Sequence, residues 1–222
     1  GGRAIISHRI YEVVLGALAQ AVPERVMAAN SHFYNPNLGG VDPVSDKQFV
    51  CYELIIGGIG GRYDKDGEEA LASPWNAANI PVEVQESNNP ILIQRFEFIK
   101  DSAGPGKNRG GCGVRKDIEL LSDKVNFYNL GDRAKFAPYS LGGGKPGCLA
   151  QTLLNPDTKV EAVLQSKGTY RLNSGDVISW RTAGGGGYGD PLQRDPERVR
   201  VDVMRGFVSS DQAKLAYGVV ID

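Results

Sequence analysis

The chain has 222 residues, enough to bury a hydrophobic core in one or two domains without disulfide bonds. Its 25 basic and 26 acidic residues nearly cancel, so neither nucleic acid nor an anionic membrane is favoured as a partner. Cys51, Cys112 and Cys148 are far apart and odd in number, which argues against a disulfide framework. The sequence has neither an apolar run of membrane-spanning length nor a signal-peptide pattern, so we expect a cytoplasmic protein with reduced thiols.

The first regular pattern along the chain is helical. Apolar residues recur at three- and four-residue spacings between Ile10 and Val22, which places them on one stripe of a helix. Ser7 is a candidate N-cap and Pro23 a candidate stop, so we predict a helix over residues 7–22. The next segment, SHFYNPNLGGVDP, is rich in Asn, Pro and Gly and predicts a loop.

Strand signals dominate the middle of the chain. Alternating apolar and polar residues predict strands in the segments QFVCYELII, PVEVQE, ILIQRFEFIK, GVRKDIELLS and KVNFYNLGDR. Turn-forming residues separate them, so we expect an antiparallel meander. Two further short strands flank a hairpin-type turn at residues 173–176.

Helical spacing returns near the end of the chain. Asp195 followed by Pro196 predicts a helix start, and Gly206 predicts its end. Residues 209–211 predict the cap of a second helix that runs to Tyr217. The pattern as a whole predicts one α+β unit over residues 1–222, mainly antiparallel β with flanking helices at both ends.

Two glycine runs resemble nucleotide-binding loops only superficially. Residues 57–61 follow a strand, but no apolar helical stripe comes next to offer a helix N-terminus to a phosphate. Residues 182–191, TAGGGGYGDP, lack the Lys-Ser/Thr ending of a P-loop. We therefore expect turns or close backbone packing, and a tight turn from the last strand toward the helix near Asp195.

The polar candidates are few. His8 and His32 are the only histidines and have no partner at metal-ligand spacing, so we expect capping or surface roles and no metal or cofactor site built from this chain alone. Glu53 with Arg62, and Asn76 with Asn79, lie between strand signals. Arg can grip a carboxylate or phosphate and Asn can orient an amide, which suits substrate positioning. The alternative is that these groups satisfy the backbone of buried loops.

Several ordered strings together resemble the hydantoinase B/oxoprolinase family. They are the helix start SHRIYEVV, the stretch YELIIGGIGGR, the region NIPVEVQE, the run DSAGPGKNRGGCG, and the closing LGGGKPG and TAGGGGYGDP. The resemblance covers essentially the whole chain. It implies the C-terminal part of a longer subunit, with metal-binding His and Asp residues mainly upstream of this region.

The resemblance also implies a reaction logic and a partner. A hydantoinase A-type subunit holds ATP and Mg, and ATP phosphorylates an amide or enolate oxygen. Glu53 and Arg62 then become candidate catalytic residues, and Asn76 and Asn79 candidate substrate-binding residues. Glu53 supports the loop or a proton transfer, and the other three help to position a cyclic amide.

One departure from the family pattern keeps other functions open. Many hydrolase members have a His-x-His pair where this chain has Ala72-Ser73-Pro74-Trp75. The leading hypothesis is an ATP-dependent hydrolase of hydantoins, 5-oxoproline or lactams. The missing imidazoles favour an ATP-dependent carboxylase of acetone or acetophenone, and the incomplete catalytic set favours a non-catalytic scaffold that docks the partner.

Overall fold

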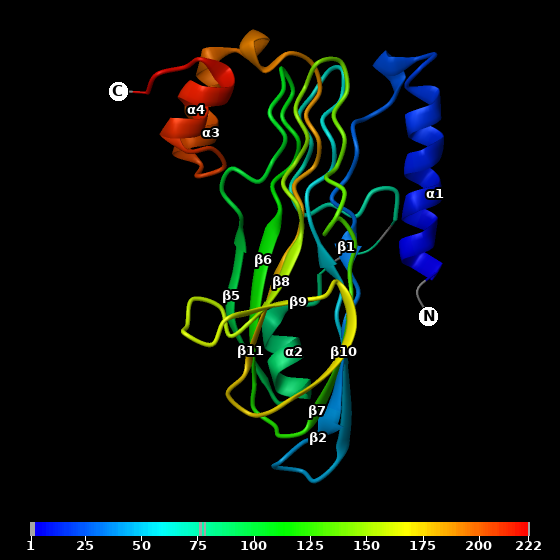
Figure 1. The fold of residues 1–222 in the computed structure, drawn as a ribbon, viewed down its shortest axis with the longest axis vertical. Helices are drawn as coiled ribbons and strands as arrows, with labels where there is room; N and C mark the ends of the chain where they lie inside the picture. Colours follow the sequence, from blue (N-terminus) through cyan, green and yellow to red (C-terminus); the bar gives the residue numbers. More distant parts are fainter. Residues whose placement is uncertain (1–2, 76, 78, 222) are drawn as a thin grey trace.

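The computed structural model describes residues 3–75, 77 and 79–221 of the chain (Figure 1). Its helices are α1 (Arg3–Leu18), α2 (Val82–Asn88), α3 (Pro196–Met204) and α4 (Ser210–Tyr217), with short 3-10 turns η1 (Pro23–Arg25) and η2 (Pro191–Gln193). Its strands are β1 (Phe33–Tyr34), β2 (Asn37–Val41), β3 (Gln48–Tyr52), β4 (Ile55–Ile56), β5 (Ile91–Phe98), β6 (Val114–Leu120), β7 (Val125–Leu130), β8 (Gln151–Leu154), β9 (Ala162–Leu164), β10 (Lys167–Leu172) and β11 (Val177–Arg181).

Two antiparallel sheets form the lower half of the molecule in Figure 1. One has the strand order β10-β7-β2-β3, the other the order β5-β6-β11-β8-β9, and β1 pairs with β4 separately. The sheets share one core, in which Phe127 of β7 meets Trp180 of β11 edge to face at 5.6 Å between ring centroids. The predicted α+β class with mainly antiparallel strands and a helix at each end is confirmed.

The local predictions failed where a short pattern fits two structures. PVEVQE forms most of helix α2 and not a strand: Pro81 precedes the first turn, and Gln85 is the residue that the helix buries. The loop predicted after the first helix contains β1 and β2. The turn at residues 173–176 joins β10 to β11 in different sheets, and β6 and β7 also separate into different sheets. The meander is therefore interrupted by crossings between the sheets.

The terminal helices match the predictions better at the C-terminal end. Asp195 caps α3, and Ser209 caps α4 by accepting a bond from the amide of Gln212. Helix α1 already includes Arg3, so Ser7 lies inside it, and it ends at Leu18 because the next residues form a turn ahead of Pro23.

Glycine-rich segments occupy the upper half of the molecule, between α1 on one side and α3–α4 on the other (Figure 1). We call these the glycine-rich bundle: residues 57–61, 104–113, 142–147 and 184–187. Successive amides of Gly185, Gly186 and Gly187 donate to three different segments, at the carbonyls of Gly111, Ala29 and Lys145. When successive amides donate to three different neighbours, the pattern is typical of extended chains that have three residues per turn and form no hydrogen bonds within one chain.

The glycines of the closing run permit close packing and do not form the predicted tight turn. A Cβ atom at Gly185 would lie 2.0 Å from the carbonyl oxygen of Ile59, and one at Gly186 would lie 2.0 Å from that of Tyr139. The run from Gly184 to Gly187 is buried and has no positive φ angle; the left-handed residue comes later, at Gly189. These amides donate their hydrogen bonds to backbone carbonyls. In a phosphate-binding loop, by contrast, the amides point toward the ligand and donate to it.

Buried ion pairs hold α3 and α4 against the glycine-rich bundle. Arg194 pairs with Asp66 at 2.7 Å and with Asp202 at 2.6 Å, and its guanidinium lies 6.0 Å from the Tyr217 ring centroid. Arg109 of the bundle reaches the same Asp202 at 3.4 Å. We call Asp66, Arg109, Arg194 and Asp202 the Arg194 cluster.

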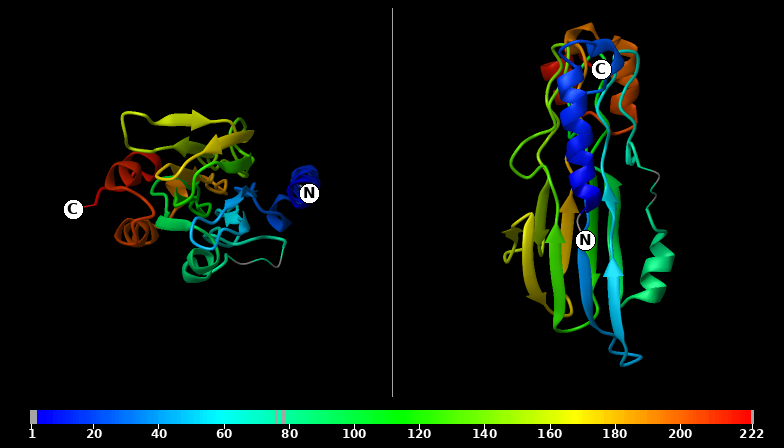
Figure 2. Two further views of the ribbon diagram at one scale, coloured as in Figure 1. Left: turned by 90° about the horizontal axis from the view of Figure 1, so that it is seen from below. Right: turned by 90° about the vertical axis from the view of Figure 1, so that its right-hand side faces the viewer.

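Helix α1 packs differently. Its inward face carries Ile5, His8 and Glu12, all buried. The apolar stripe found in the sequence faces outward, and its exposed large members are Ile10, Val13, Val14 and Leu18, with Ile6 exposed one turn earlier. Seen from below, in the left view of Figure 2, α1 lies at the edge of the molecule opposite α3 and α4. In the described residues, no helix has both the length and the apolar content to cross a membrane.

Candidate functional site

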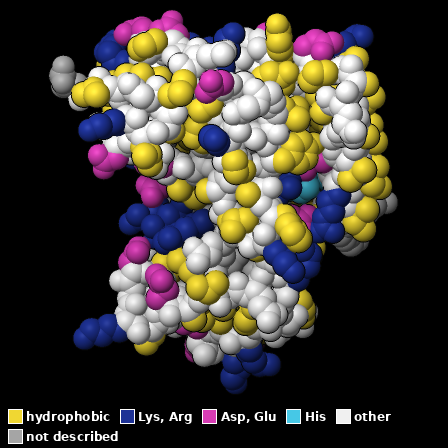
Figure 3. Space-filling view, turned by 45° about the horizontal axis from the view of Figure 1, so that its top comes forward, with side chains coloured by type: hydrophobic (Ala, Val, Ile, Leu, Met, Phe, Trp, Pro, Cys, Tyr) yellow, Lys and Arg dark blue, Asp and Glu magenta, His cyan; other side chains and the backbone are white. Residues whose placement is uncertain are grey.

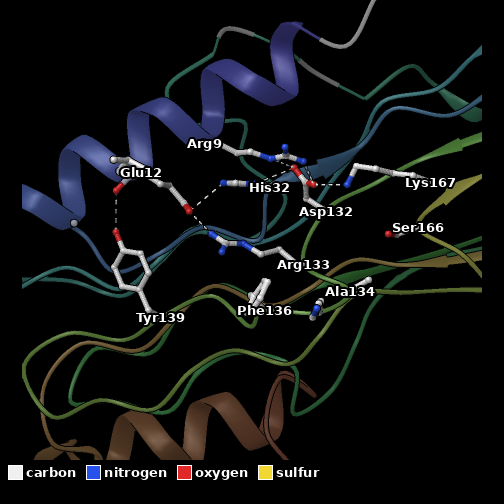
Figure 4. A pocket seen from close by; sticks show the side chains of 13 residues that line it. Arg9, Glu12, His32, Asp132, Arg133, Ala134, Phe136, Tyr139, Ser166 and Lys167 are labelled. Atoms are coloured by element: carbon white, nitrogen blue, oxygen red, sulfur yellow. Dashed lines mark hydrogen bonds and ion pairs between the residues drawn. The ribbon is translucent and has the colours of Figure 1, made fainter.

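His32 lies at the centre of a charged cluster between α1 and the bundle. It immediately precedes β1 and has a φ angle of 60°, in the left-handed region that non-glycine residues rarely adopt. Its Nε2 atom is 3.1 Å from Glu12 Oε2, and its Nδ1 atom is 3.6 Å from Asp132 Oδ2. A buried imidazole therefore has a carboxylate at each ring nitrogen (Figure 4).

Cations hold both carboxylates in place. Arg133 pairs with Glu12, which also accepts a 2.6 Å bond from the amide of Asn30. Asp132 accepts a 2.9 Å bond from Arg9 Nε and a 3.0 Å bond from Lys167 Nζ. We call these residues the His32 cluster: Arg9, Glu12, His32, Asp132, Arg133 and Lys167. It joins α1, the start of β1, the end of β7 and the start of β10.

The environment of His32 favours its charged form. Burial alone lowers the pKa of an imidazole, but the interactions of His32 with Asp132 and Glu12 outweigh burial and raise its pKa. Burial likewise opposes ionisation of Glu12 and Asp132, yet His32 and the neighbouring Arg and Lys side chains lower the pKa of both carboxyls. The cluster thus combines ionised carboxylates with an imidazole that retains its proton at a higher pH than usual.

The cluster opens into a pocket of about 600 Å³. The polar part of its lining consists of the six residues of the cluster with Ser166 and Lys135. The apolar and aromatic part consists of Val13 and Gly16 of α1 with Ala134, Phe136 and Tyr139. Figure 3 shows a histidine at the bottom of a hollow beside α1, bordered by Lys and Arg side chains. This volume suits a small molecule.

His8 lies next to the cluster but has the opposite electrostatics. Its ring is 5.5 Å from that of His32, contacts Phe33 at 4.5 Å and stacks on Trp75 at 5.6 Å. Neither ring nitrogen has a hydrogen-bond partner in the described part of the chain. Burial, reinforced by the charge of His32, lowers the pKa of His8 to about 4. The pKa values of two adjacent histidines are therefore shifted in opposite directions.

Both histidines contradict the expected capping or surface role, because they are only 3% and 7% exposed. Within the residues that the structure describes, no three His, Cys, Asp or Glu side chains gather as a metal-binding group. The carboxylates of the His32 cluster are instead shared with Arg and Lys.

The predicted site residues lie elsewhere. Glu53 is 2% exposed, bonds to Lys116 Nζ at 2.9 Å and accepts a bond from Gln85, so it joins the start of β4 to α2 and β6. Arg62 forms an ion pair with Glu68 at the edge of the bundle. Asn79 is partly buried, and Asn76 lies outside the described residues. Among the described residues, no hydrogen bond or ion pair joins Glu53, Arg62 and Asn79 to one another, and none of the three lines the pocket. Their predicted roles stay predictions.

A modest sequence signal could have pointed to the new site. His8 and Glu12 are four residues apart, so they lie on one face of a helix whose other face is apolar. A buried polar face on an amphipathic helix indicates a polar partner in the fold. The partners Asp132 and Arg133 follow more than a hundred residues later, and no local pattern connects them to α1.

Comparison with known proteins gives the same family along most of the chain. The model of the hydantoinase B/oxoprolinase family matches residues 1–191. The caprolactamase subunit beta of Pseudomonas jessenii is 34% identical over 93% of this chain and 37% of its own length. The crystal structure of the ATP-dependent caprolactamase from Pseudomonas jessenii superposes with a TM-score of 0.80 and 30% identity, covering 93% of this chain and 37% of that chain.

A carboxylase subunit is also similar. The acetophenone carboxylase delta subunit of Aromatoleum aromaticum is 29% identical over 78% of this chain and 30% of its own length. The chain spans 36% to 38% of the length of three curated relatives. Relatives of this kind are enzymes or subunits of enzymes, and the family model covers well over half of the sequence. This chain belongs to the hydantoinase B/oxoprolinase family.

Proposed function

We propose that the chain is part of the B-type subunit of an ATP-dependent cyclic-amide hydrolase. The observation that carries the proposal is the similarity to caprolactamase subunit beta, in sequence over 93% of this chain and in fold with a TM-score of 0.80. Hydantoins, 5-oxoproline and lactams share the ring amide that such an enzyme opens.

The proposed complex has further components. A hydantoinase A-type partner supplies ATP with Mg, and the remainder of the B-type subunit supplies any divalent metal. The length of the relatives supports this division, because the chain matches little more than a third of them. We expect the isolated chain to be inactive and the assembled enzyme to work in the cytoplasm.

The chemistry we assign to the pocket is proton transfer. Opening an amide ring requires a proton for the departing nitrogen, and a positioned acid or base accelerates such a step. His32 is the candidate, because the interactions that raise its pKa favour its protonated form and its ring borders the pocket. Glu12 and Asp132 lie beside its two ring nitrogens, at 3.1 Å and 3.6 Å.

The test is an assay of the full-length subunit with its ATP-binding partner. We expect ATP-dependent ring opening of a hydantoin, 5-oxoproline or a lactam, and a loss of about 10²-fold or more in kcat for His32→Gln. His8→Phe is the matched control, since it removes the neighbouring imidazole but keeps an aromatic ring against Trp75. Wild-type turnover in His32→Gln would contradict the role of His32.

The roles predicted for Glu53, Arg62, Asn76 and Asn79 enter the proposal unchanged, as catalytic and substrate-positioning residues of the assembled enzyme. The same assay tests them through Arg62→Ala and Asn79→Ala. Unchanged turnover in both variants would remove the assignment. For Glu53, the buried pair with Lys116 supports a role in holding the loop.

Two observations favour other functions. Similarity to the acetophenone carboxylase delta subunit, and Ala72–Trp75 in place of a His-x-His pair, favour ATP-dependent carboxylation of a ketone. Incorporation of labelled bicarbonate with acetone or acetophenone would support this reaction, and none with either ketone would count against it.

The exposed apolar stripe of α1 favours a scaffold that docks other parts of the complex. A scaffold would bind the ATP-binding partner without taking part in turnover. Loss of turnover in His32→Gln with unchanged partner binding would therefore reject a purely structural role.

A further inference from the structure

The His32 cluster contains more positive than negative charge. Asp132 alone faces Arg9, Lys167 and His32, and Glu12 faces Arg133 and the same imidazole. Two carboxylates are thus shared by three permanent cations and a histidine whose charged form is favoured. An enclosed group of charges with this imbalance attracts an anion.

The excess positive charge lies on the solvent side of the pocket. The side chains of Arg9 and Lys167 are 45% and 51% exposed, whereas those of Glu12 and Asp132 are 8% and 9% exposed. Arginine has five N–H donors and lysine three, so Arg9 and Lys167 each keep donors beyond those that they give to Asp132 and, for Lys167, to the carbonyl of Gly131.

Lys135 adds an unused cation to the same pocket. Its ammonium group lies 5.5 Å from the ring centroid of Phe136, and the structure gives it no carboxylate partner among the described residues. Ser166 adds a hydroxyl to the lining. A cationic side chain without a carboxylate partner leaves its charge available to an anion.

The apolar part of the lining restricts the kind of anion. Val13, Gly16, Phe136 and Tyr139 present apolar and aromatic surface to the pocket of about 600 Å³. A small molecule with an apolar or cyclic body and one oxyanion matches this mixed lining. A macromolecular ligand does not fit this volume.

We propose that the pocket beside α1 binds small organic oxyanions, carboxylates or phosphates, through Arg9, Lys135 and Lys167 above His32. The inference names the substrate class of the pocket and to that extent rests on the proposed function. A carboxylate would belong to the substrate itself, whereas a phosphate would belong to a substrate activated by ATP. Either group would place the apolar body against Phe136 and Tyr139.

Binding is measured without turnover, on the subunit that contains this chain, so that the two proposals fail separately. We would titrate sodium benzoate and inorganic phosphate at constant ionic strength and follow the ring resonances of the histidines by NMR. We expect saturable shifts of the His32 resonance at millimolar anion. Response to benzoate alone identifies a carboxylate site, and response to phosphate alone identifies a phosphate site; both support the proposal.

Lys135→Gln tests the site with a matched control. Loss of a charged contact should weaken anion binding about tenfold. Lys159→Gln makes the same change of net charge at an exposed lysine outside the pocket, and should change affinity less than about twofold. Equal weakening by both variants, or no response of His32 to either anion, would overturn the inference. Anion binding by a subunit that opens no ring would overturn the proposed function alone.

Discussion

The two flanks of the glycine-rich bundle both bury charge, with different results. On the α3–α4 flank, Arg194 and Arg109 lie against Asp202 and Asp66, and aromatic rings cover the guanidinium groups. On the α1 flank, the carboxylates flank an imidazole and the cluster opens into a pocket. Guanidinium groups keep their charge at any physiological pH, whereas an imidazole does not.

The two clusters therefore differ in kind: the Arg194 cluster holds α3 and α4 against the bundle, whereas the His32 cluster is a candidate reactive site. Buried, fully paired charges are costly to disrupt and hold two elements in one arrangement. A titratable group beside a cavity can exchange a proton with a ligand. The burial of charge alone therefore does not identify a functional site in this fold; the open pocket and the histidine do.

The largest expected effect comes from the bundle that supports both flanks. Gly185→Ala places a Cβ atom 2.0 Å from the carbonyl oxygen of Ile59, where backbone meets backbone and neither can move aside. We expect the variant not to fold, as judged by circular dichroism and solubility. Gly39→Ala is the matched control, because its Cβ would meet Phe49 O at an ordinary 3.7 Å. A folded, stable Gly185→Ala would contradict the packing described.

The next largest effect tests whether the Arg194 cluster holds α3 and α4 against the bundle. Asp202→Ala removes the carboxylate that Arg194 and Arg109 share, while Asp66 and Glu69 remain as their partners; the loss of two charged contacts should cost about 3–4 kcal/mol in the free energy of unfolding. Denaturant titration measures this loss. Glu197→Gln removes an exposed ion pair with Arg200 and should leave the midpoint unchanged. Similar denaturation midpoints for the two variants would show that the Arg194 cluster does not hold α3 and α4 against the bundle.

A smaller effect concerns His8. Its folded pKa, about 4, lies below the unfolded value, so the unfolded chain takes up the proton first and stability falls as pH drops from about 6.5 to about 4. His8→Phe removes this loss, worth about 3 kcal/mol at the acidic end. Unfolding titrations of wild type and variant across this range provide the comparison. A stability difference independent of pH would contradict a neutral, buried His8.

The smallest effect has the opposite sign. The pKa of His32 is raised, so its contribution to stability is complete below the unfolded pKa and is lost as pH rises through the folded pKa. The stability advantage of wild type over His32→Gln should therefore shrink as pH rises above about 6.5. Denaturant titrations at several pH values measure it, and an advantage that grows with pH would contradict the ionic role of His32.

Sequence patterns predicted what depends on neighbouring residues. Asp195-Pro196 and Ser209 mark helix starts because a cap and its amide are two or three residues apart. The segments that predicted strands β5, β6 and β7 are each ten residues long, enough to favour a strand over a helix: ILIQRFEFIK, GVRKDIELLS and KVNFYNLGDR. The six residues of PVEVQE were too few for that distinction.

The candidate site depends on distant residues, which explains why it was missed. Glu12 meets Arg133, and Arg9 meets Asp132, across more than 120 positions in each case. Sequence spacing predicts a capping or surface role for His32, because its carboxylate partners are not close in sequence. The closing glycine run lacks the Lys-Ser/Thr ending of a P-loop, but the run itself does not reveal its packing against three other segments.

The most direct test of the account is an NMR pH titration of the histidine rings. The chain has two histidines, so each resonance can be assigned with His8→Phe alone. We predict one ring that titrates above the ordinary value of about 6.5, which is His32, and one that titrates near pH 4, which is His8. Two rings that both titrate near 6.5, or in the reverse order, would contradict a charged His32 at the pocket beside α1.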